Sequence, residues 1–503
     1  MSSLLLALLP LVHAEPPEAE PPPPPPVDLS GLYAIWGLNQ HGFLLGADHP
    51  LDDSDYVVQM LRVNAKANRD HFGVVARLDA AQGWWGVDNE PDVQELVSVD
   101  DDGAVSSATT YNPYALFRDK DTNYTVHVDL AYAWVEVPRV PFPVKVQAGR
   151  QYYSVGHKLV LDQDADGVQL LAQPTEALGV DLLWAKVSEG QGSYKSPKGL
   201  LMSDDGVWAD ADLFGGRARL GLGDAFAGEL YGLHYRDRSG ADAATWNPEG
   251  LGHFNARFSP NLSVVTALGA SADGRVELAE GLRYAAEGAW LFGRDEVDND
   301  DHLGGLLDIN DGRLFGWTAY VALDQHVALG IPMRVGATFG AGSGDDDVTS
   351  GPGNINKIMT MGFFPFTNVW EDSVMPDLEG ISPQGLGSPV SRGYREFSNT
   401  IAVQGRAGVT PHEKLDLEVS YTWLRATAPI RGFDATGTPT GPGSTDLGQE
   451  VDANLKIKVW KGFSYAALFG VFLPGEAAGK LINGDTDTLE PAWEVKQVVS
   501  AAF

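Results

Sequence analysis

The fold is decided by two neighbouring stretches, MLRVNAKAN at residues 60–68 and FGVVARLDAA at residues 72–81. In both stretches small or apolar residues alternate with polar ones, and in an extended chain successive side chains point to opposite faces. The tripeptide at residues 69–71 leaves room only for a tight turn between them. We therefore expect an antiparallel hairpin with one apolar face and one polar face.

The same alternation recurs in segments of about ten residues separated by turns, a spacing typical of barrel strands that cross a membrane. The clearest further examples are residues 124–134, 401–409, 415–423, 451–459 and 493–503. The pattern gives roughly 16 to 18 strands, and an even number is expected. No stretch contains about 18 consecutive apolar residues, so a bundle of membrane-spanning helices is excluded.

Connections between these segments fall into two classes. Short turns are expected at residues 259–261, 324–330 and 460–462, whereas the longest connection runs from Ala341 to Glu396. We expect an all-β fold, a single transmembrane antiparallel β-barrel of about 18 strands with short periplasmic turns and long external loops. Aromatic residues near strand ends predict girdles at the membrane interfaces, with Trp134, Trp423 and Tyr465 as examples. A soluble β-sandwich or β-helix, which also alternates, is the alternative.

The amino terminus has the features of an export signal. Residues 4–12 form a short apolar run, and Val12-His13-Ala14 matches a small-x-Ala cleavage site, so we expect a signal peptide over residues 1–14. Residues 15–27 are rich in proline and predict an extended linker. The barrel is then expected to occupy residues 28–503.

Composition excludes several kinds of chemistry. The net charge is −33, from 68 acidic and 35 basic residues, which argues against nucleic acid as a partner because phosphate binding needs a basic surface. The absence of cysteine excludes disulfides, thiolate metal sites and a cysteine nucleophile. The sequence shows no zinc spacing among its 11 histidines, no nucleophile elbow and no phosphate-binding loop. We therefore expect a chain without a cofactor that is not an enzyme.

One acidic stretch resembles a metal-binding loop. Asp162, Asp164 and Asp166, followed by Gly167, match the start of an EF-hand calcium loop. The twelfth position is Gln173 rather than the glutamate that such loops use, and no helices are expected beside it. An ordinary acidic loop is the favoured interpretation, and calcium binding is the weaker one.

Strand parity also predicts the lining of the barrel. If the apolar parity faces lipid, the polar parity faces the lumen. The charged residues assigned to the lumen are Arg62, Lys66, Arg77, Asp79, Asp129, Lys145, Arg334, Arg406, Asp416, Glu418, Glu450, Asp452, Lys456 and Lys458. Lysine and arginine rings lower the barrier for anions, so one hypothesis is a weakly anion-preferring or mixed lumen. The other is that facing acids and bases neutralise each other and brace the wall.

The carboxyl-terminal region carries a family resemblance. DLGQEVD at residues 446–452 opens a strand, FLPG at residues 472–475 ends its partner, and a closing strand ends at Phe503. Together with MLRVN at residues 60–64 and VQAGRQ at residues 146–151, this pattern resembles the outer-membrane alginate-export porin family, as a distant member. The resemblance implies a monomeric barrel of about 18 strands that passes a polymer or solute. Strand-borne arginine is sparser here than in that family's founding members, so alginate itself is not carried over.

These features together predict a porin of the Gram-negative outer membrane that conducts a small solute or an anionic polysaccharide by passive diffusion. The expected partners are outer-membrane lipid, an anionic or neutral saccharide or small solute, and the barrel-assembly machinery, for which Phe503 is the candidate signal. Two other functions stay open: an outer-membrane barrel enzyme such as a hydrolase, and a structural or adhesive barrel plugged by its own loops.

Overall fold

The computed structural model describes most of the chain from residue 27 onward. The described residues are 27–43, 45–46, 54–82, 93–99, 105–111, 125–188, 211–237, 264–276, 279–294, 313–345, 356, 358, 360, 362, 364, 367–370, 397–433, 439–484, 486–487 and 489–503. The expected signal peptide at residues 1–14 and nearly all of the linker at residues 15–27 lie outside them, as does the expected turn at residues 259–261.

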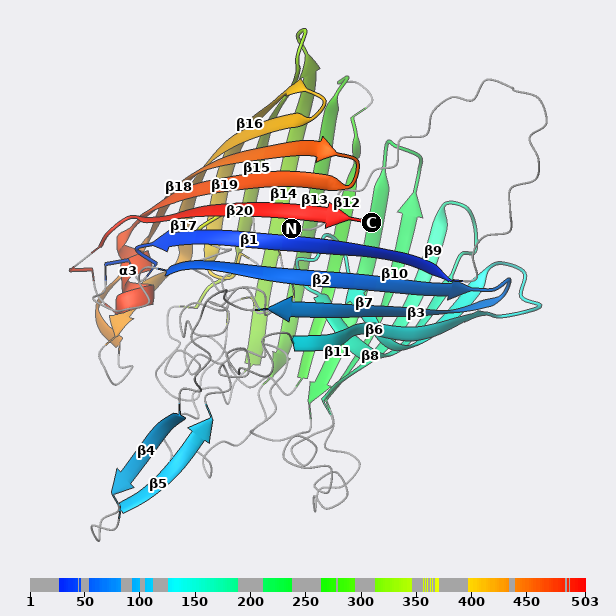
Figure 1. Cartoon of the computed structure of the whole chain (residues 1–503), viewed down its shortest axis with the longest axis horizontal. Helices are drawn as coiled ribbons and strands as arrows, with labels where there is room; N and C mark the ends of the chain where they lie inside the picture. The colour runs from blue at the N-terminus through cyan, green and yellow to red at the C-terminus, as the bar shows by residue number, and fades with distance from the viewer. Residues whose placement is uncertain are drawn as a thin grey trace.

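In the described part of the chain, eighteen strands form one antiparallel sheet and two more form a separate hairpin. The sheet contains β1 (Asp28–His41), β2 (Ser54–Asn68), β3 (Phe72–Gln82), β6 (Thr125–Glu136), β7 (Val144–Ser154), β8 (Asp162–Ala172), β9 (Leu178–Ser188), β10 (Ala211–Gly221), β11 (Ala227–Asp237), β12 (Val264–Arg275), β13 (Leu282–Arg294), β14 (Arg313–Ala328), β15 (Pro332–Gly342), β16 (Thr400–His412), β17 (Leu415–Phe433), β18 (Pro439–Trp460), β19 (Phe463–Pro474) and β20 (Ala492–Ala502). The hairpin of β4 (Val93–Val99) and β5 (Val105–Tyr111) stands apart from this sheet (Figure 1).

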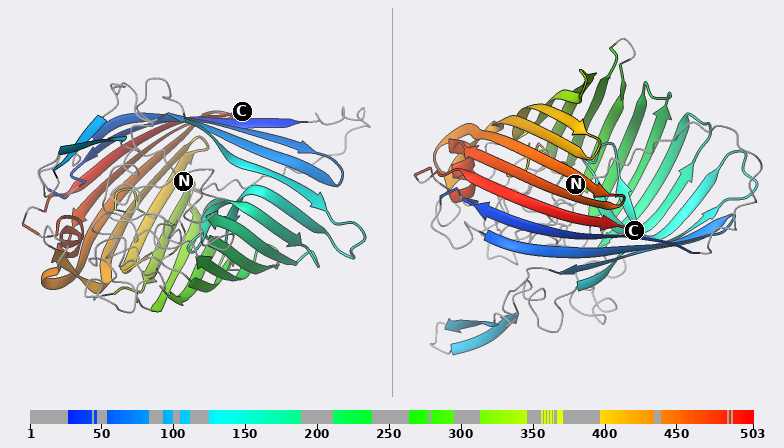
Figure 2. Two further views of the ribbon diagram at one scale, coloured as in Figure 1. Left: turned by 90° about the horizontal axis from the view of Figure 1, so that it is seen from below. Right: turned by 45° about the horizontal axis from the view of Figure 1, so that its top comes forward.

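The sheet closes on itself. Each strand pairs with its neighbours along the chain, and β20 pairs with β1 from Leu32 opposite Ala502 to His41 opposite Trp493. The last residue extends this seam, because the backbone amides of Gly31 and Phe503 donate to each other's carbonyl oxygens at 2.8 and 3.0 Å. The expected closed antiparallel barrel of 16 to 18 strands is confirmed, with 18 strands (Figure 2).

The wall has two chemically different faces, as the alternation predicted. Large apolar side chains stand exposed on the outer face, for example Leu230, Phe315 and Val419. Their neighbours in sequence, such as Tyr231 and Leu314, are buried on the opposite face. An exposed apolar surface that surrounds a closed wall is what a barrel presents to lipid.

Connections at one rim are short, and most of those at the other are long. The short turns include residues 69–71 between β2 and β3 and residues 461–462 between β18 and β19, whereas residues 343–399 separate β15 from β16 at the long rim. The sequence-based turn at residues 324–330 was placed too early, because β14 continues to Ala328 and Asp324 lies within it.

A β-bulge corrects the predicted orientation of Trp134. The register between β3 and β6 shifts at Asp129, so that Arg77 pairs with Leu130 while Leu78 pairs with Val128. The shift turns the later part of β6 over, and Trp134 covers Gly73 on the inner face instead of joining an outer girdle. Trp423 does stand exposed on the outer face.

One short helix is described, α3 (Glu476–Asn483), and it lies beside β17 and β18 at the long-connection rim (Figures 1 and 2). Its buried residues join a hydrophobic cluster with Leu424, Leu447 and Phe472. Within the described part of the chain, no helix has the length and apolar character needed to cross a membrane.

Candidate functional site inside the barrel

The β7–β8 hairpin leaves the wall and folds inward. Pairing of β7 with β6 ends at Arg150, and pairing of β8 with β9 ends at Asp166. Beyond these points, β7 and β8 pair only with each other among the described strands, and this pairing extends to Ser154 opposite Asp162. Residues 151–165 therefore form an inserted hairpin.

One face of the inserted hairpin packs against the inner wall. Tyr153, Val155 and Leu161 are buried in a cluster with wall residues from β9 to β14, including Leu213, Tyr235 and Leu291. Burying such side chains removes apolar area from water, at about 25 cal/mol per Å². Apolar packing against the wall thus holds the hairpin in place, and the hairpin fills one side of the lumen.

Wall carboxylates clamp the tip of the hairpin. The backbone amide of Gly156 donates to Glu229 Oε1 at 2.7 Å, and that of His157 donates to Glu287 Oε2 at 2.5 Å. The Tyr231 hydroxyl donates to the other Glu287 oxygen at 2.7 Å. The ring of His157 shares a hydrogen bond with the Tyr320 hydroxyl through Nδ1. Hydrogen bonds to charged acceptors are stronger than neutral ones, so these contacts fix the position of the tip.

A second segment, from the connection between β15 and β16, is clamped in the same way. The Glu450 side chain is fully buried, and its oxygens accept the backbone amides of Asn368, Val369 and Trp370 at 2.8, 2.7 and 2.9 Å. The ring of Trp370 stacks on Phe472 with centroids 4.8 Å apart. The long connection expected over residues 341–396 therefore contributes an inward segment, which we call the 356–370 segment after its described residues 356, 358, 360, 362, 364 and 367–370.

The 356–370 segment also contacts the inserted hairpin. An added Cβ on Gly362 would lie 2.3 Å from the Leu159 carbonyl oxygen and 2.5 Å from that of Lys158. The two backbones thus meet at a distance that only glycine allows at this position. Their contact links the hairpin, which Glu287 of β13 holds, to the 356–370 segment, which Glu450 of β18 holds. The two segments together narrow the interior of the barrel.

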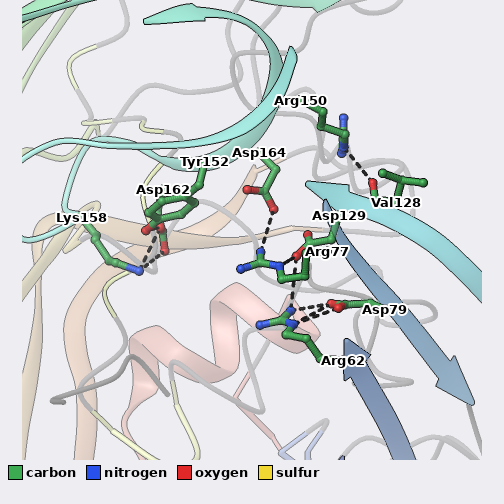
Figure 3. A network of polar contacts seen from close by, with 10 residues as sticks. All are labelled: Arg62, Arg77, Asp79, Val128, Asp129, Arg150, Tyr152, Lys158, Asp162 and Asp164. Atoms are coloured by element: carbon green, nitrogen blue, oxygen red, sulfur yellow. Dashed lines mark hydrogen bonds and ion pairs between the residues drawn. The ribbon is translucent and has the colours of Figure 1, made fainter. Parts of the chain in front are cut away.

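Charged side chains from β2, β3, β6 and the hairpin form one network (Figure 3). Arg62 donates to both Asp79 oxygens, the shortest contact being 2.5 Å, and its Nη2 is 3.7 Å from Asp129. Arg77 pairs with Asp129, and its Nη2 lies 3.8 Å from Asp164 on the hairpin. Two bases thus alternate with three acids along the inner face, from wall to hairpin.

At the hairpin tip, Lys158 donates to Asp162 Oδ2 at 3.2 Å, beside the Tyr152 hydroxyl. Burial alone would lower the pKa of Lys158, but hydrogen bonds with Tyr152 and Asp162 raise it above its ordinary value. The lysine therefore stays charged at neutral pH.

A second network lies on β14 to β17. Arg334 donates to both oxygens of Asp416 at 2.7 and 2.8 Å and to Glu418 at 2.8 Å. Arg406 donates to both oxygens of Asp324, at 2.9 and 2.5 Å. Planar two-point pairs of this kind hold guanidinium and carboxylate in a fixed orientation.

The other charged residues assigned to the lumen are placed as follows. Lys145 lies over the Trp134 ring, 4.3 Å from its centroid. Asp452 is buried beside Glu450 and accepts the Ser420 hydroxyl at 3.0 Å. Three lysines are exposed nearer the short-turn rim, on the same strand faces as Arg62 and Asp452: Lys66, Lys456 and Lys458.

The calcium-loop interpretation of Asp162, Asp164 and Asp166 is wrong in its geometry, and so is the ordinary-loop alternative. These residues lie in β8, on the strand that faces β7, rather than in a loop. Asp162 and Asp164 approach Lys158 and Arg77. Across the described residues, no group of three or more histidine, aspartate or glutamate side chains is arranged to hold a metal ion.

Several residues of the interior were missed from the sequence. Asp181 on β9 accepts from Arg217 at 2.7 Å and from Arg219 at 2.9 Å, and Arg217 also donates to the Ser154 carbonyl of the hairpin at 2.7 Å. The alternation of polar residues in β9 and β10 could have indicated that Asp181, Arg217 and Arg219 face the lumen. The clamps Glu229 and Glu287 had no such signal, because their partners are backbone amides more than 70 residues away.

Fold and interior together define a class: a closed 18-stranded antiparallel barrel whose lumen is narrowed by segments of its own chain. No protein-family model and no curated protein matches the sequence. Among solved structures, the chain resembles OccAB3 of Acinetobacter baumannii, with a TM-score of 0.51 and 10% identity over 95% of this chain and 99% of that one. OccAB4 of the same organism gives a TM-score of 0.50 and 10% identity over 95% and 98%. The chain thus shares the barrel fold of the Occ porins.

Proposed function

We propose that the protein is a channel of the bacterial outer membrane through which small polar solutes pass by passive diffusion. The observation that carries this function is the two-faced closed wall, apolar outside and lined with arginine–carboxylate pairs inside. The apolar outer band is stable in contact with lipid, and the charged inner face is stable in contact with water. The fold shared with the Occ porins supports this function.

The two inward segments favour small solutes over a polymer. The inserted hairpin and the 356–370 segment meet at Leu159 and Gly362, so any path must run beside them. We propose that the path follows the arginine networks on β2, β3, β6 and β14 to β17. Kinship with the alginate-export porins rests on the carboxyl-terminal motifs and remains a finer hypothesis within this function.

We propose a mixed lumen rather than a strongly anion-preferring one. Each lumen arginine of the two networks lies within 3 Å of at least one carboxylate oxygen. Paired charges present little net field to a passing ion. This favours the bracing interpretation of the charged lining.

The experiment that tests the function is liposome swelling with a graded series of neutral sugars and acidic oligosaccharides, together with planar-bilayer recordings. Swelling that falls steeply with sugar size is expected. Reversal potentials in a salt gradient test the lumen charge, and small values of either sign are expected. No swelling and no conductance from correctly folded protein would instead support a plugged structural barrel.

A further inference from the structure

His157, at the tip of the inserted hairpin, is surrounded by side chains of the opposite wall. Its Nε2 lies 3.5 Å from Asp273 Oδ1 on β12, and its Nδ1 lies 3.8 Å from Glu287 Oε2 on β13. The Tyr320 hydroxyl of β14 shares a hydrogen bond with the same Nδ1. The His157 side chain is 23% exposed, so water reaches the ring and can exchange a proton with it. Three wall strands thus contact one titratable group.

The wall around this ring is acidic. Its titratable side chains, from β11 to β14, are Glu229, Tyr231, Asp273, Glu287 and Tyr320. The two nearby bases already have carboxylate partners, because Lys158 pairs with Asp162 and Arg217 pairs with Asp181. From the 356–370 segment, Phe364 packs on Tyr320 and brings no charge. A positive charge on the ring of His157 would therefore meet carboxylates.

The ring of His157 has partners in both of its protonation states. A neutral imidazole has one donor and one acceptor nitrogen, which suits Nε2 as donor to Asp273 and Nδ1 as acceptor from the Tyr320 hydroxyl. After protonation both nitrogens donate, and the ring carries a positive charge between Asp273 and Glu287. Glu287 already accepts the backbone amide of His157 at 2.5 Å. Protonation thus strengthens a contact that is formed in either state.

We propose that His157 is a pH-sensitive latch, whose protonation tightens the docking of the hairpin tip on β12 and β13 and steadies the channel in acid. Histidine ordinarily changes its charge between about pH 5 and pH 8. Asp273 and Glu287 stabilise the charged ring only while the tip is docked. Docking therefore gains stability at low pH and loses this contribution as the pH rises through that range. This inference rests on the proposed channel function and adds a form of regulation to it.

The test is single-channel recording of the full-length protein in planar bilayers at about pH 5 and about pH 8. Wild type is expected to show about fivefold fewer brief conductance changes at the lower pH, the factor that one unit charge about 4 Å away gives in water. His157→Gln keeps a polar side chain without the charge, so its recordings should be the same at both pH values. Asp273→Asn keeps the ring but removes one carboxylate, so its response should be smaller than that of wild type.

His71→Gln is the matched control. His71 also lies beside a carboxylate, with its Nδ1 3.2 Å from Glu136 Oε2, but it is exposed in the short turn between β2 and β3. This variant should keep the wild-type response to pH. A wild-type response in His157→Gln, or more frequent conductance changes of the wild type in acid, would overturn the latch.

Hydrogen exchange tests the latch without conduction. After correction for the intrinsic pH dependence of exchange, the backbone amides of Gly156 and His157 should be about fivefold better protected at the lower pH in wild type. In His157→Gln, protection at residues 156 and 157 should be equal at both pH values. A conducting wild type with equal protection at both pH values refutes the latch and leaves the channel intact. A wild type with pH-dependent protection that conducts nothing supports the latch, while the channel proposal fails.

Discussion

Gly362 packs directly against the Leu159 carbonyl oxygen, and this contact joins the two segments that narrow the barrel. A Cβ at residue 362 would lie 2.3 Å from that oxygen, closer than such atoms approach in folded proteins. The neighbouring atoms are backbone, so they cannot swing aside as a flexible side chain would.

Gly362→Val should push the 356–370 segment away from the inserted hairpin. We expect a higher and noisier unit conductance in planar bilayers, because the narrowing depends on that contact. Gly405→Ala is the control, since an added Cβ at that position meets nothing within 4 Å. A Gly362→Val channel with wild-type conductance and noise would show that the contact does not set the passage.

Glu450→Gln should release the 356–370 segment from β18. The carboxylate accepts three consecutive backbone amides, and each hydrogen bond to a charged group contributes about 1.5–3 kcal/mol. In the variant, the side-chain nitrogen of glutamine is itself a donor, so it cannot accept a hydrogen bond from these backbone N–H groups. Hydrogen exchange at residues 368–370 should accelerate by at least tenfold, whereas Glu413→Gln in the exposed β16–β17 turn should leave it unchanged. Unchanged protection at these amides in Glu450→Gln would rule out the clamp.

Asp129→Asn should shift ion selectivity toward anions. It removes the acid that Arg77 pairs with and that Arg62 approaches, so the two bases of this network face two acids instead of three and the inner face becomes less negative. One unit charge at about 4 Å contributes about 1 kcal/mol in water, so the permeability ratio should change by up to about fivefold. Reversal potentials measure the shift, with Asp70→Asn in an exposed short turn as control. A shift toward cations would contradict the proposed path.

Arg334→Gln should act in the opposite direction. Asp416 and Glu418 would lose their shared guanidinium, so the inner face would gain negative charge and favour cations. Arg334→Lys keeps the charge but not the two-point pairing, and we expect wild-type selectivity with lower thermal stability. Equal selectivity in all three proteins would mean that permeating ions do not pass this network.

The barrel could be predicted from alternation because lipid outside and water inside impose the same period of two on every strand. Arg62 and Asp79 show how far this extends: their shared parity placed them on one face, and the structure pairs them at 2.5 Å. Parity fixes only the face of a residue, however, and carries no information on which strand lies opposite.

The interior departs from the sequence pattern where the local geometry changes. The bulge at Asp129 adds one residue to β6 and reverses the face of Trp134, an irregularity that alternation alone does not mark. Asp324 was missed as the partner of Arg406 because it was assigned to a turn. The inserted hairpin has no lipid-facing side, so Tyr152 and Tyr153 on its two faces gave no signal that it had left the wall.

The insertion of the β7–β8 hairpin has a consequence for how the molecule folds. His157 reaches Glu287 across 130 residues of sequence and Tyr320 across 163, so its docking surface does not exist until β13 and β14 have been laid down. Contacts of such high sequence separation form late. The hairpin therefore docks only after β13 and β14 have formed, although the strands at its base are already paired. The passage thus acquires its final shape among the last events of assembly.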